Sequence, residues 1–172
     1  MPEAAVNGPR RCYYCKKALF TTLWKRAAED GYTVLLDGTN ASDDAGDRPG
    51  MQALRELEVR SPLRECGITK DQVRQMSKEA GLFTWDKPAY ACLATRVPTG
   101  TAITREALEK VERGENALFK LGFTDFRVRL MGDAARIQLP EAQMERAVQL
   151  RDTIAKALEV DFSAVLLDLK GR

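Results

Sequence analysis

Residues 85–100 read WDKPAYACLATRVPTG, and this segment lies between two different patterns of secondary structure. Pro88, Pro98 and Gly100 interrupt regular structure, because proline has no backbone N–H to donate and glycine favours turns. We therefore expect most of the segment to be a loop. The patterns that precede and follow this loop decide the fold class of the chain.

Cys92 is the residue of this loop best suited to covalent chemistry. Thr95 and Arg96 follow it closely. The thiolate is the nucleophilic form of cysteine, and a neighbouring cation favours that form. The residues therefore suggest a reactive thiol that faces an anion. The alternative is that Cys92 is a small buried apolar residue, as many free cysteines are.

The residues before the loop follow the pattern of an α/β protein. Apolar residues three and four positions apart predict helices over residues 14–30, 51–57 and 70–80. Apolar or extended runs predict short strands over residues 33–36 and 59–63, the first of them buried. This order of elements matches the second half of a doubly wound parallel-sheet unit.

The first predicted strand is followed by the turn-forming residues 37–40, which read DGTN. In open α/β sheets, ligands bind at the carboxyl ends of the strands. Asp43, Asp44 and Asp47 follow shortly afterwards and could help to hold magnesium, which prefers carboxylate and phosphate oxygens. The alternative is a solvated acidic loop.

The residues after the loop follow a different pattern. A helix is predicted over residues 104–121, and a second helix over residues 141–158. Strict alternation of apolar and polar residues predicts a hairpin of strands 126–130 and 135–139. With a last strand over residues 163–169, these elements suggest a small α+β domain.

Arg127 and Arg129 lie two positions apart on one predicted strand, so their side chains point to the same face, about 7 Å apart. Paired guanidinium groups suit a phosphate or a carboxylate. Taken alone, the alternation equally fits the solvent face of a sheet. Arg136 on the partner strand could extend either interpretation.

Composition excludes several classes of protein. The 172 residues are 44% hydrophobic and 30% charged with a net charge of +2, which indicates a soluble globular protein without a strong case for nucleic-acid binding. No apolar run is long enough to span a membrane. The sequence has no histidine, so Ser-His-Asp catalysis, Cys-His catalysis and histidine-bound metals are excluded within this chain. Four cysteines fit a reducing cytoplasm better than a secreted disulfide scaffold.

Cys12 and Cys15 form a CxxC motif near the first predicted helix. A single CxxC is half of a zinc or iron–sulfur site, because structural zinc needs two further ligands. Cys66 and Cys92 could supply them, but they show no matching spacing. The motif equally fits a redox pair or two inert thiols.

Taken together, these segments resemble the LarE family of ATP-dependent sacrificial sulfur transferases, which act in the synthesis of the nickel-pincer nucleotide cofactor. The resemblance covers nearly the whole chain. It rests on blocks in the following order: RCYYCKK (11–17), DGTN (37–40), DRPG (47–50), SPL (61–63), GITK (67–70), TWDKP (84–88), ACLATR (91–96), GF (122–123), RVR (127–129) and ARI (135–137).

This resemblance implies the C-terminal part of a PP-loop ATP pyrophosphatase-like (adenine nucleotide alpha hydrolase-like) domain over residues 1–86. It implies a catalytic α+β domain over residues 87–172. In this family ATP, with magnesium, adenylates a carboxylate of a pyridinium mononucleotide. The cysteine at the position of Cys92 attacks the acyl-adenylate, and cleavage of its Cβ–S bond leaves a thiocarboxylate and dehydroalanine.

The resemblance also implies roles for individual residues. Cys92 is the sulfur donor, and Glu115 is a functional carboxylate, with an exposed helical glutamate as the alternative. Substrate and phosphate binding is expected from Thr95, Arg96, Arg127 and Arg129. The nucleotide and magnesium region is expected at Asp37, Thr39, Asn40 and Asp44.

The chain departs from the family in lacking the Ser-Gly-Gly-x-Asp-Ser phosphate loop. We therefore expect the chain alone to bind ATP poorly. Either this sequence is a truncated part of a longer protein, or a separate PP-loop subunit carries the loop. The family also implies a homo-oligomer. A competing mechanism within the family uses a [4Fe–4S] cluster on Cys12, Cys15 and Cys92 to deliver sulfur. Outside this family, the same residues fit a different thiolating or amidating PP-loop ATPase or a nonenzymatic metal-binding module.

Overall fold

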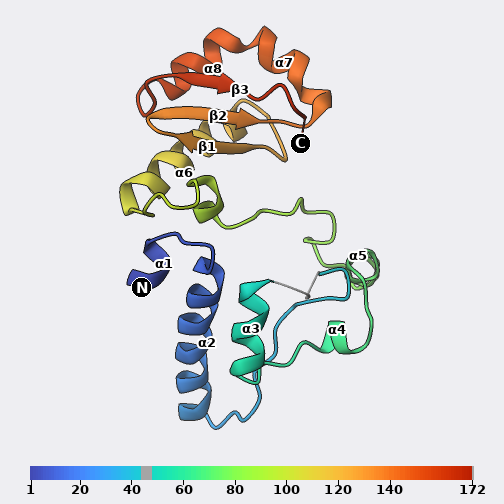
Figure 1. The fold of residues 1–172 in the computed structure, drawn as a ribbon. Helices are drawn as coiled ribbons and strands as arrows, with labels where there is room; N and C mark the ends of the chain where they lie inside the picture. Colours follow the sequence, from blue (N-terminus) through green and yellow to red (C-terminus); the bar gives the residue numbers. More distant parts are fainter. Residues whose placement is uncertain (44–47, 172) are drawn as a thin grey trace. The chain divides into compact units, whose positions relative to one another are not determined.

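The computed structural model describes residues 1–43 and 48–171 (Figure 1). Its contacts divide the chain into two compact units, Met1–Lys87 and Pro88–Arg172. No helix among the described residues has the length and the apolar character that are needed to cross a membrane.

The first unit is built mainly from helices. These are α1 (Pro2–Ala5), α2 (Arg11–Glu29), α3 (Pro49–Glu56), α4 (Pro62–Glu65) and α5 (Lys70–Glu79). The predicted helices over residues 14–30, 51–57 and 70–80 are thus confirmed, each within a few residues of its expected ends. Trp24 ties α2 to the end of α3, because its indole Nε1 donates to the carbonyl of Leu57 at 2.7 Å.

The predicted parallel sheet of this unit is reduced to one parallel bridge between Leu36 and Arg60. The parallel direction agrees with the prediction, but the described residues of the unit form no longer strand. The first run is also not buried, since Val34 and Leu36 are more than half exposed. A stable strand needs neighbouring strands that form hydrogen bonds with its backbone N–H and C=O groups. It also needs other elements that cover its apolar face. The described residues provide only this one bridge.

The second unit has the predicted α+β composition. A three-stranded sheet has the order β1-β2-β3, with β1 antiparallel to β2 and β2 parallel to β3. Figure 1 shows α7 and α8 running along the sheet. The elements are η1 (Leu93–Arg96), α6 (Arg105–Lys120), β1 (Arg127–Met131), β2 (Ala134–Gln138), η2 (Glu141–Gln143), α7 (Met144–Gln149), α8 (Arg151–Leu158) and β3 (Val165–Leu167).

Two predicted elements of this unit are corrected. The single helix over residues 141–158 is divided into η2, α7 and α8, and Leu150 ends α7 and precedes α8. Leu150 has backbone angles of φ −95° and ψ 14°, which depart from the helical values, and it packs against the hydrophobic core. The last strand is shorter than predicted, because only three residues pair with β2.

The sheet of the second unit has two different faces. Val128 and Leu130 on β1, with Ala135 and Ile137 on β2, are buried in the core with side chains of α6 and α8. Because neighbouring residues of a strand point to opposite faces, the other face carries the polar residues of these strands. These are Arg127, Arg129, Arg136 and Gln138.

Candidate functional site

Cys92 lies on the loop that precedes the short helix η1, and the loop prediction is confirmed. Its side chain is exposed and forms no disulfide. The alternative of a small buried cysteine is therefore wrong. Solvent, and any substrate that reaches this loop, has access to the thiol.

Thr95 ties the backbone of Cys92 into the first turn of η1. Both its amide and its hydroxyl Oγ1 donate to the carbonyl of Cys92, at 2.9 and 2.8 Å. Arg129 from β1 in turn donates from Nη1 to the carbonyl of Thr95 at 2.6 Å. The loop is thereby attached to the polar face of the sheet.

Arg96 and Glu115 form a buried ion pair directly behind this loop. Each residue is only 1% exposed. Arg96 donates from Nε to Oε1 of Glu115 at 2.7 Å and from Nη2 to Oε2 at 3.2 Å. The amide of Val128 adds a third bond, to Oε1 at 3.1 Å. The exposed helical glutamate considered from the sequence is therefore wrong for Glu115.

The guanidinium groups of Arg96, Arg127 and Arg129 share one function in this geometry, and we call them the arginine clamp. Arg96 Nη1 donates to the carbonyl of Ala91 at 3.2 Å and to Oγ1 of Thr95 at 2.8 Å. Arg127 Nη2 donates to the carbonyl of Ala89 at 2.8 Å. The clamp therefore fixes the backbone on both sides of the cysteine.

Tyr90 completes this network, and its role was not predicted from the sequence. Its hydroxyl donates to Oε2 of Glu115 at 2.6 Å, and the guanidinium groups of Arg96 and Arg127 lie over its ring. Burial, followed by the hydrogen bond to Glu115, raises the pKa of Tyr90 to about 12. Only its position two residues before Cys92 could have indicated this role.

In the first unit, Asp37 and Ser61 each follow a residue of the parallel bridge. The Asp37 carboxylate accepts from Ser61 Oγ at 2.6 Å and from Thr39 Oγ1 at 2.6 Å. Burial tends to raise the pKa of Asp37, but these hydrogen bonds outweigh it and the pKa is lowered. The structure thus brings Asp37 and Thr39 together at the predicted strand end and adds Ser61, whose role the sequence did not indicate.

Asn40 lies in the turn that follows, where its backbone amide donates to Oδ2 of Asp43 at 3.0 Å. Asp44 and Asp47, which were predicted for the magnesium region, lie outside the described residues. Among the described residues of the chain, no group of three or more cysteines or carboxylates is arranged to hold a metal ion.

The two cysteines of the CxxC motif lie near the N-terminus of α2. Cys12 is exposed and Cys15 is half-buried, and both are free thiols. They belong to the first unit, whereas Cys92 belongs to the second. A cluster on these three residues would draw ligands from both units, and it stays a prediction.

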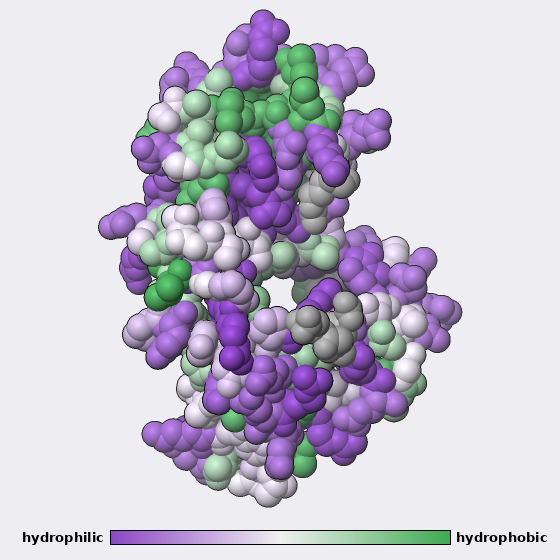
Figure 2. All heavy atoms as spheres, viewed as in Figure 1, coloured by the Kyte–Doolittle hydropathy of each residue, from purple (hydrophilic) through white to green (hydrophobic). Residues whose placement is uncertain are grey.

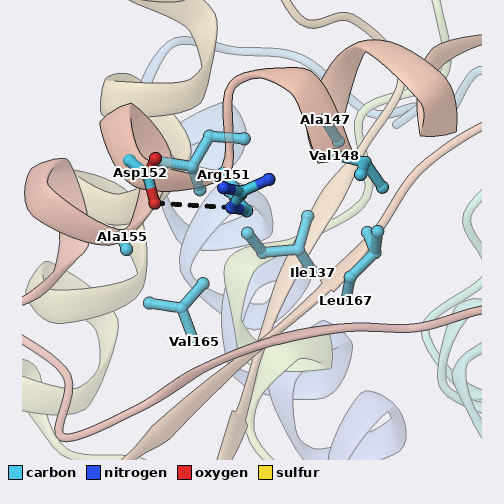
Figure 3. A pocket seen from close by; sticks show the side chains of 9 residues that line it. Ile137, Ala147, Val148, Arg151, Asp152, Ala155, Val165 and Leu167 are labelled. Carbon is cyan, nitrogen blue, oxygen red and sulfur yellow. Dashed lines mark ion pairs between the residues drawn. The ribbon is translucent and has the colours of Figure 1, made fainter.

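The second unit also contains an apolar cavity of about 350 Å³ between α7, α8 and the core face of the sheet (Figure 3). Figure 2 shows hydrophobic side chains gathered on the upper part of the molecule in that view. An exposed ion pair of Arg151 and Asp152 lies at the cavity. None of the site residues predicted from the sequence lines this cavity. The remaining lining residues are Ile137, Ala147, Val148, Ile154, Ala155, Val165 and Leu167.

Three relatives match almost the whole chain. An uncharacterized protein of Synechocystis is 43% identical over 99% of the chain and 65% of its own length. The pyridinium-3,5-bisthiocarboxylic acid mononucleotide synthase of Lactiplantibacillus plantarum is 37% identical over 96% of the chain and 60% of its own length. An uncharacterized protein of Methanocaldococcus jannaschii is 32% identical over 95% of the chain and 64% of its own length.

The chain therefore spans between 60% and 65% of the length of these three relatives. No family model matches the chain. The matched segment includes the cysteine loop, the arginine clamp and the Asp37 turn, since the alignments cover 95% or more of the chain.

Proposed function

The chain belongs to the LarE family, and from this premise we propose that it is a sulfur transferase that converts a carboxylate of a pyridinium mononucleotide into a thiocarboxylate. The name of its Lactiplantibacillus plantarum relative describes a synthase of such a thiocarboxylic acid. The observation that carries the proposal is the exposed thiol of Cys92 on a loop fixed by the arginine clamp.

The proposed chemistry begins with transfer of AMP from ATP to the substrate carboxylate, which releases pyrophosphate. The Cys92 thiolate then attacks the acyl carbon, so that the C–S bond forms and AMP leaves. A base removes the proton from Cα of Cys92, and its electron pair forms the Cα–Cβ double bond as the Cβ–S bond breaks. The sulfur leaves as the thiocarboxylate, and dehydroalanine remains in the chain.

The arginine clamp supports this reaction by holding the cysteine in place. We propose that Arg129 and Thr95 also meet the anionic part of the substrate, because guanidinium and hydroxyl groups suit phosphate. Arg127, which was expected in this group, is only 4% exposed and donates from Nη1 and Nη2 to the carbonyls of Phe126 and Ala89, so it holds the loop instead. Arg96 has a different role, since its Nε, Nη1 and Nη2 all donate to protein acceptors. It orients the loop rather than binding the substrate.

Glu115 was expected to be a catalytic carboxylate, and the geometry favours a positioning role. Its two oxygens accept bonds from two nitrogens of Arg96, from the Tyr90 hydroxyl and from the Val128 amide. Both oxygens are thus occupied by donors of the protein itself, and the side chain is only 1% exposed. The base that removes the Cα proton is therefore another carboxylate or a lysine, because the chain has no histidine.

ATP and magnesium are proposed to bind at the Asp37 turn of the first unit. The oxygens of Asp37 and Thr39 are of the type that magnesium prefers, and both follow the parallel bridge. Magnesium would neutralise the phosphate charge during adenylation. The phosphate loop of the family is not among these 172 residues, so ATP binding is tested with that loop supplied by a fragment of a relative.

The test is a peptide map of the chain before and after incubation with ATP, magnesium, a PP-loop fragment of a relative and pyridinium-3,5-dicarboxylic acid mononucleotide, the carboxylate that corresponds to the product in the relative's name. We expect the peptide with Cys92 to lose the elements of H₂S as thiocarboxylate forms. Cys92→Ser should abolish product, and Cys66→Ser, which removes another exposed thiol, should not. Full product with Cys92→Ser would exclude the proposal.

The iron–sulfur mechanism predicts a different result. If a cluster on Cys12, Cys15 and Cys92 delivers sulfur, product accumulates while Cys92 keeps its sulfur atom. Anaerobically purified protein would then contain iron and absorb visible light, and Cys12→Ser would remove both signals. A different thiolating or amidating ATPase would leave Cys92 and the pyridinium substrate unchanged and act on another acid. A nonenzymatic module would bind metal without any product.

A further inference from the structure

Arg136 stands directly opposite Arg129 in the register of the β1–β2 hairpin. Paired residues on one face of neighbouring antiparallel strands have their Cβ atoms about 4.5–5.5 Å apart. Two like charges in such a pair destabilise a sheet unless an anion lies near them. The polar face of the second unit therefore concentrates positive charge beside the cysteine loop, to which Arg129 is bonded through Thr95.

A single network links the two arginines. Arg129 Nε donates to Oε1 of Gln138, and Gln138 Nε2 donates to Oδ2 of Asp168 at 2.8 Å. Asp168 then faces Arg136, with 3.7 Å between Oδ2 and Nε, which is beyond hydrogen-bond length. The network thus sets one carboxylate against two guanidinium groups and has a surplus positive charge.

Arg136 Nε is incompletely satisfied in this network. It is buried and has no hydrogen-bond partner among the described residues. A buried donor without a hydrogen-bond partner is rare in native proteins, and a bound water or ion is one of the explanations for such a donor. Nε itself is buried, but two fifths of the Arg136 side chain is exposed, so an anion can reach the side chain from the solvent.

We propose that Arg136 is a specificity-determining residue that closes with Arg129 on the phosphate of the mononucleotide substrate. A phosphate monoester carries up to two negative charges and three acceptor oxygens, which match two guanidinium forks better than a single carboxylate does. Asp168 holds Arg136 in place until the phosphate arrives. The identity of the ligand rests on the proposed function, but the anion site rests on the hairpin.

Calorimetric titration of the 172-residue chain, without ATP or turnover, tests this proposal. The ligands are nicotinic acid mononucleotide, the phosphate-free nicotinic acid riboside and inorganic phosphate. We expect the mononucleotide to bind at least about tenfold more tightly than the riboside, because charge-assisted hydrogen bonds are lost with the phosphate. Tight binding of inorganic phosphate without this preference would assign the site to a free anion and overturn the substrate role.

Substitutions of Arg136 test whether this residue binds the phosphate. Arg136→Gln should remove the preference for the mononucleotide and leave riboside binding unchanged, and Arg136→Lys should restore part of it as a second, conservative test. Arg151→Gln, on an exposed arginine at the apolar cavity, should bind like wild type. Unchanged affinity in Arg136→Gln, or no binding of mononucleotide to the wild-type chain, would overturn the proposal. Cys92→Ser should still bind normally, so a failure of sulfur transfer is distinguishable from a failure of binding.

Discussion

Arg96 Nε lies 2.7 Å from Oε1 of Glu115, and neither side chain is more than 1% exposed to solvent. This ion pair lies directly behind the loop of Cys92, because the same guanidinium group also donates to the carbonyl of Ala91. A buried ion pair contributes little net stability relative to apolar residues, but removal of one partner leaves an uncompensated charge. Substitution of either Arg96 or Glu115 should therefore disturb the geometry of the cysteine loop.

Glu115→Ala should destabilise the second unit by about 3–5 kcal/mol, because it leaves the buried charge of Arg96 without its counter-ion. Urea denaturation followed by far-UV circular dichroism measures the change. The matched control is Arg113→Ala on the same helix, which breaks an ion pair with Asp161 whose arginine side chain is 57% exposed. That variant should cost no more than about 1 kcal/mol. Equal effects of the two variants would show that burial of the Arg96–Glu115 pair is unimportant.

Thr95→Val should loosen the cysteine loop without unfolding the unit. The substitution removes the hydroxyl that donates to the carbonyl of Cys92 and accepts from Arg96 Nη1. We expect faster hydrogen exchange of the backbone amides over residues 89–97, measured by mass spectrometry. Thr95→Ser keeps the hydroxyl and should retain the wild-type protection. Identical exchange in Thr95→Val and wild type would mean that backbone bonds alone hold the loop.

Tyr90 should titrate far above an ordinary tyrosine. The pKa is raised from 10.0 to about 12, first by burial and then by the hydrogen bond to Glu115. Because the folded-state pKa is the higher one, the stability contribution of the neutral phenol is present below pH 10. It is lost as pH rises towards 12. Tyr90 is about half exposed, so solvent screening reduces the size of this contribution.

Ultraviolet difference titration of wild type against Tyr90→Phe measures this pKa directly, because the subtraction cancels the other three tyrosines. We expect a phenolate signal with a midpoint near 12. Glu115→Gln, which removes the neighbouring charge, should lower that midpoint. A midpoint near 10 in the wild-type protein would contradict the hydrogen bond from Tyr90 to Glu115.

The helices of this protein were predictable because their signals are local. For α6 the apolar spacing and the N-cap both lie within one short segment of sequence, and Thr104 Oγ1 accepts from the amide of Ala107 at the start of the helix. The hairpin was predictable for the same reason, since alternation and a turn at Gly132 lie within one short segment. Strand pairing in the first unit depends on partners outside the segment. Residues 33–36 were therefore predicted as a strand where only one bridge forms.

Some members of the candidate site were named from the sequence, whereas Tyr90 and the arrangement of the residues were not. Cys92, Thr95 and Arg129 were named from the sequence, and the structure brings their backbones and side chains together. The link between Arg96 and Glu115 joins residues that are 19 positions apart, one at the end of η1 and the other on α6. No spacing in the sequence indicates such a contact. Glu115 was expected from the sequence to be a catalytic carboxylate, and we now propose that it is a positioning residue that holds Arg96 and Tyr90.

Gly114 precedes Glu115 on α6, and Gly114→Ala tests how tightly α6 is packed against the core next to Glu115. An added Cβ would lie 3.1 Å from the ring of Phe162, 3.4 Å from Val128 and 3.5 Å from Leu158. All three neighbours are buried and cannot move aside easily. Overpacking costs about 1–3 kcal/mol. The gain in helix propensity from glycine to alanine is only about 1 kcal/mol. The variant should therefore be less stable than wild type by circular dichroism.

Gly50→Ala on α3 is the matched control for this prediction. Its added Cβ would lie 3.2 Å from Cδ of Lys16, which is part of a flexible side chain that can move away at little cost. The helix-propensity gain then dominates, so Gly50→Ala should be neutral or more stable by up to about 1 kcal/mol. Trp24 and Trp85 both lie in the first unit, and their fluorescence reports its unfolding. Stabilisation by both substitutions would show that the core around Gly114 has room for a methyl group, and that Glu115 is less firmly held than its contacts indicate.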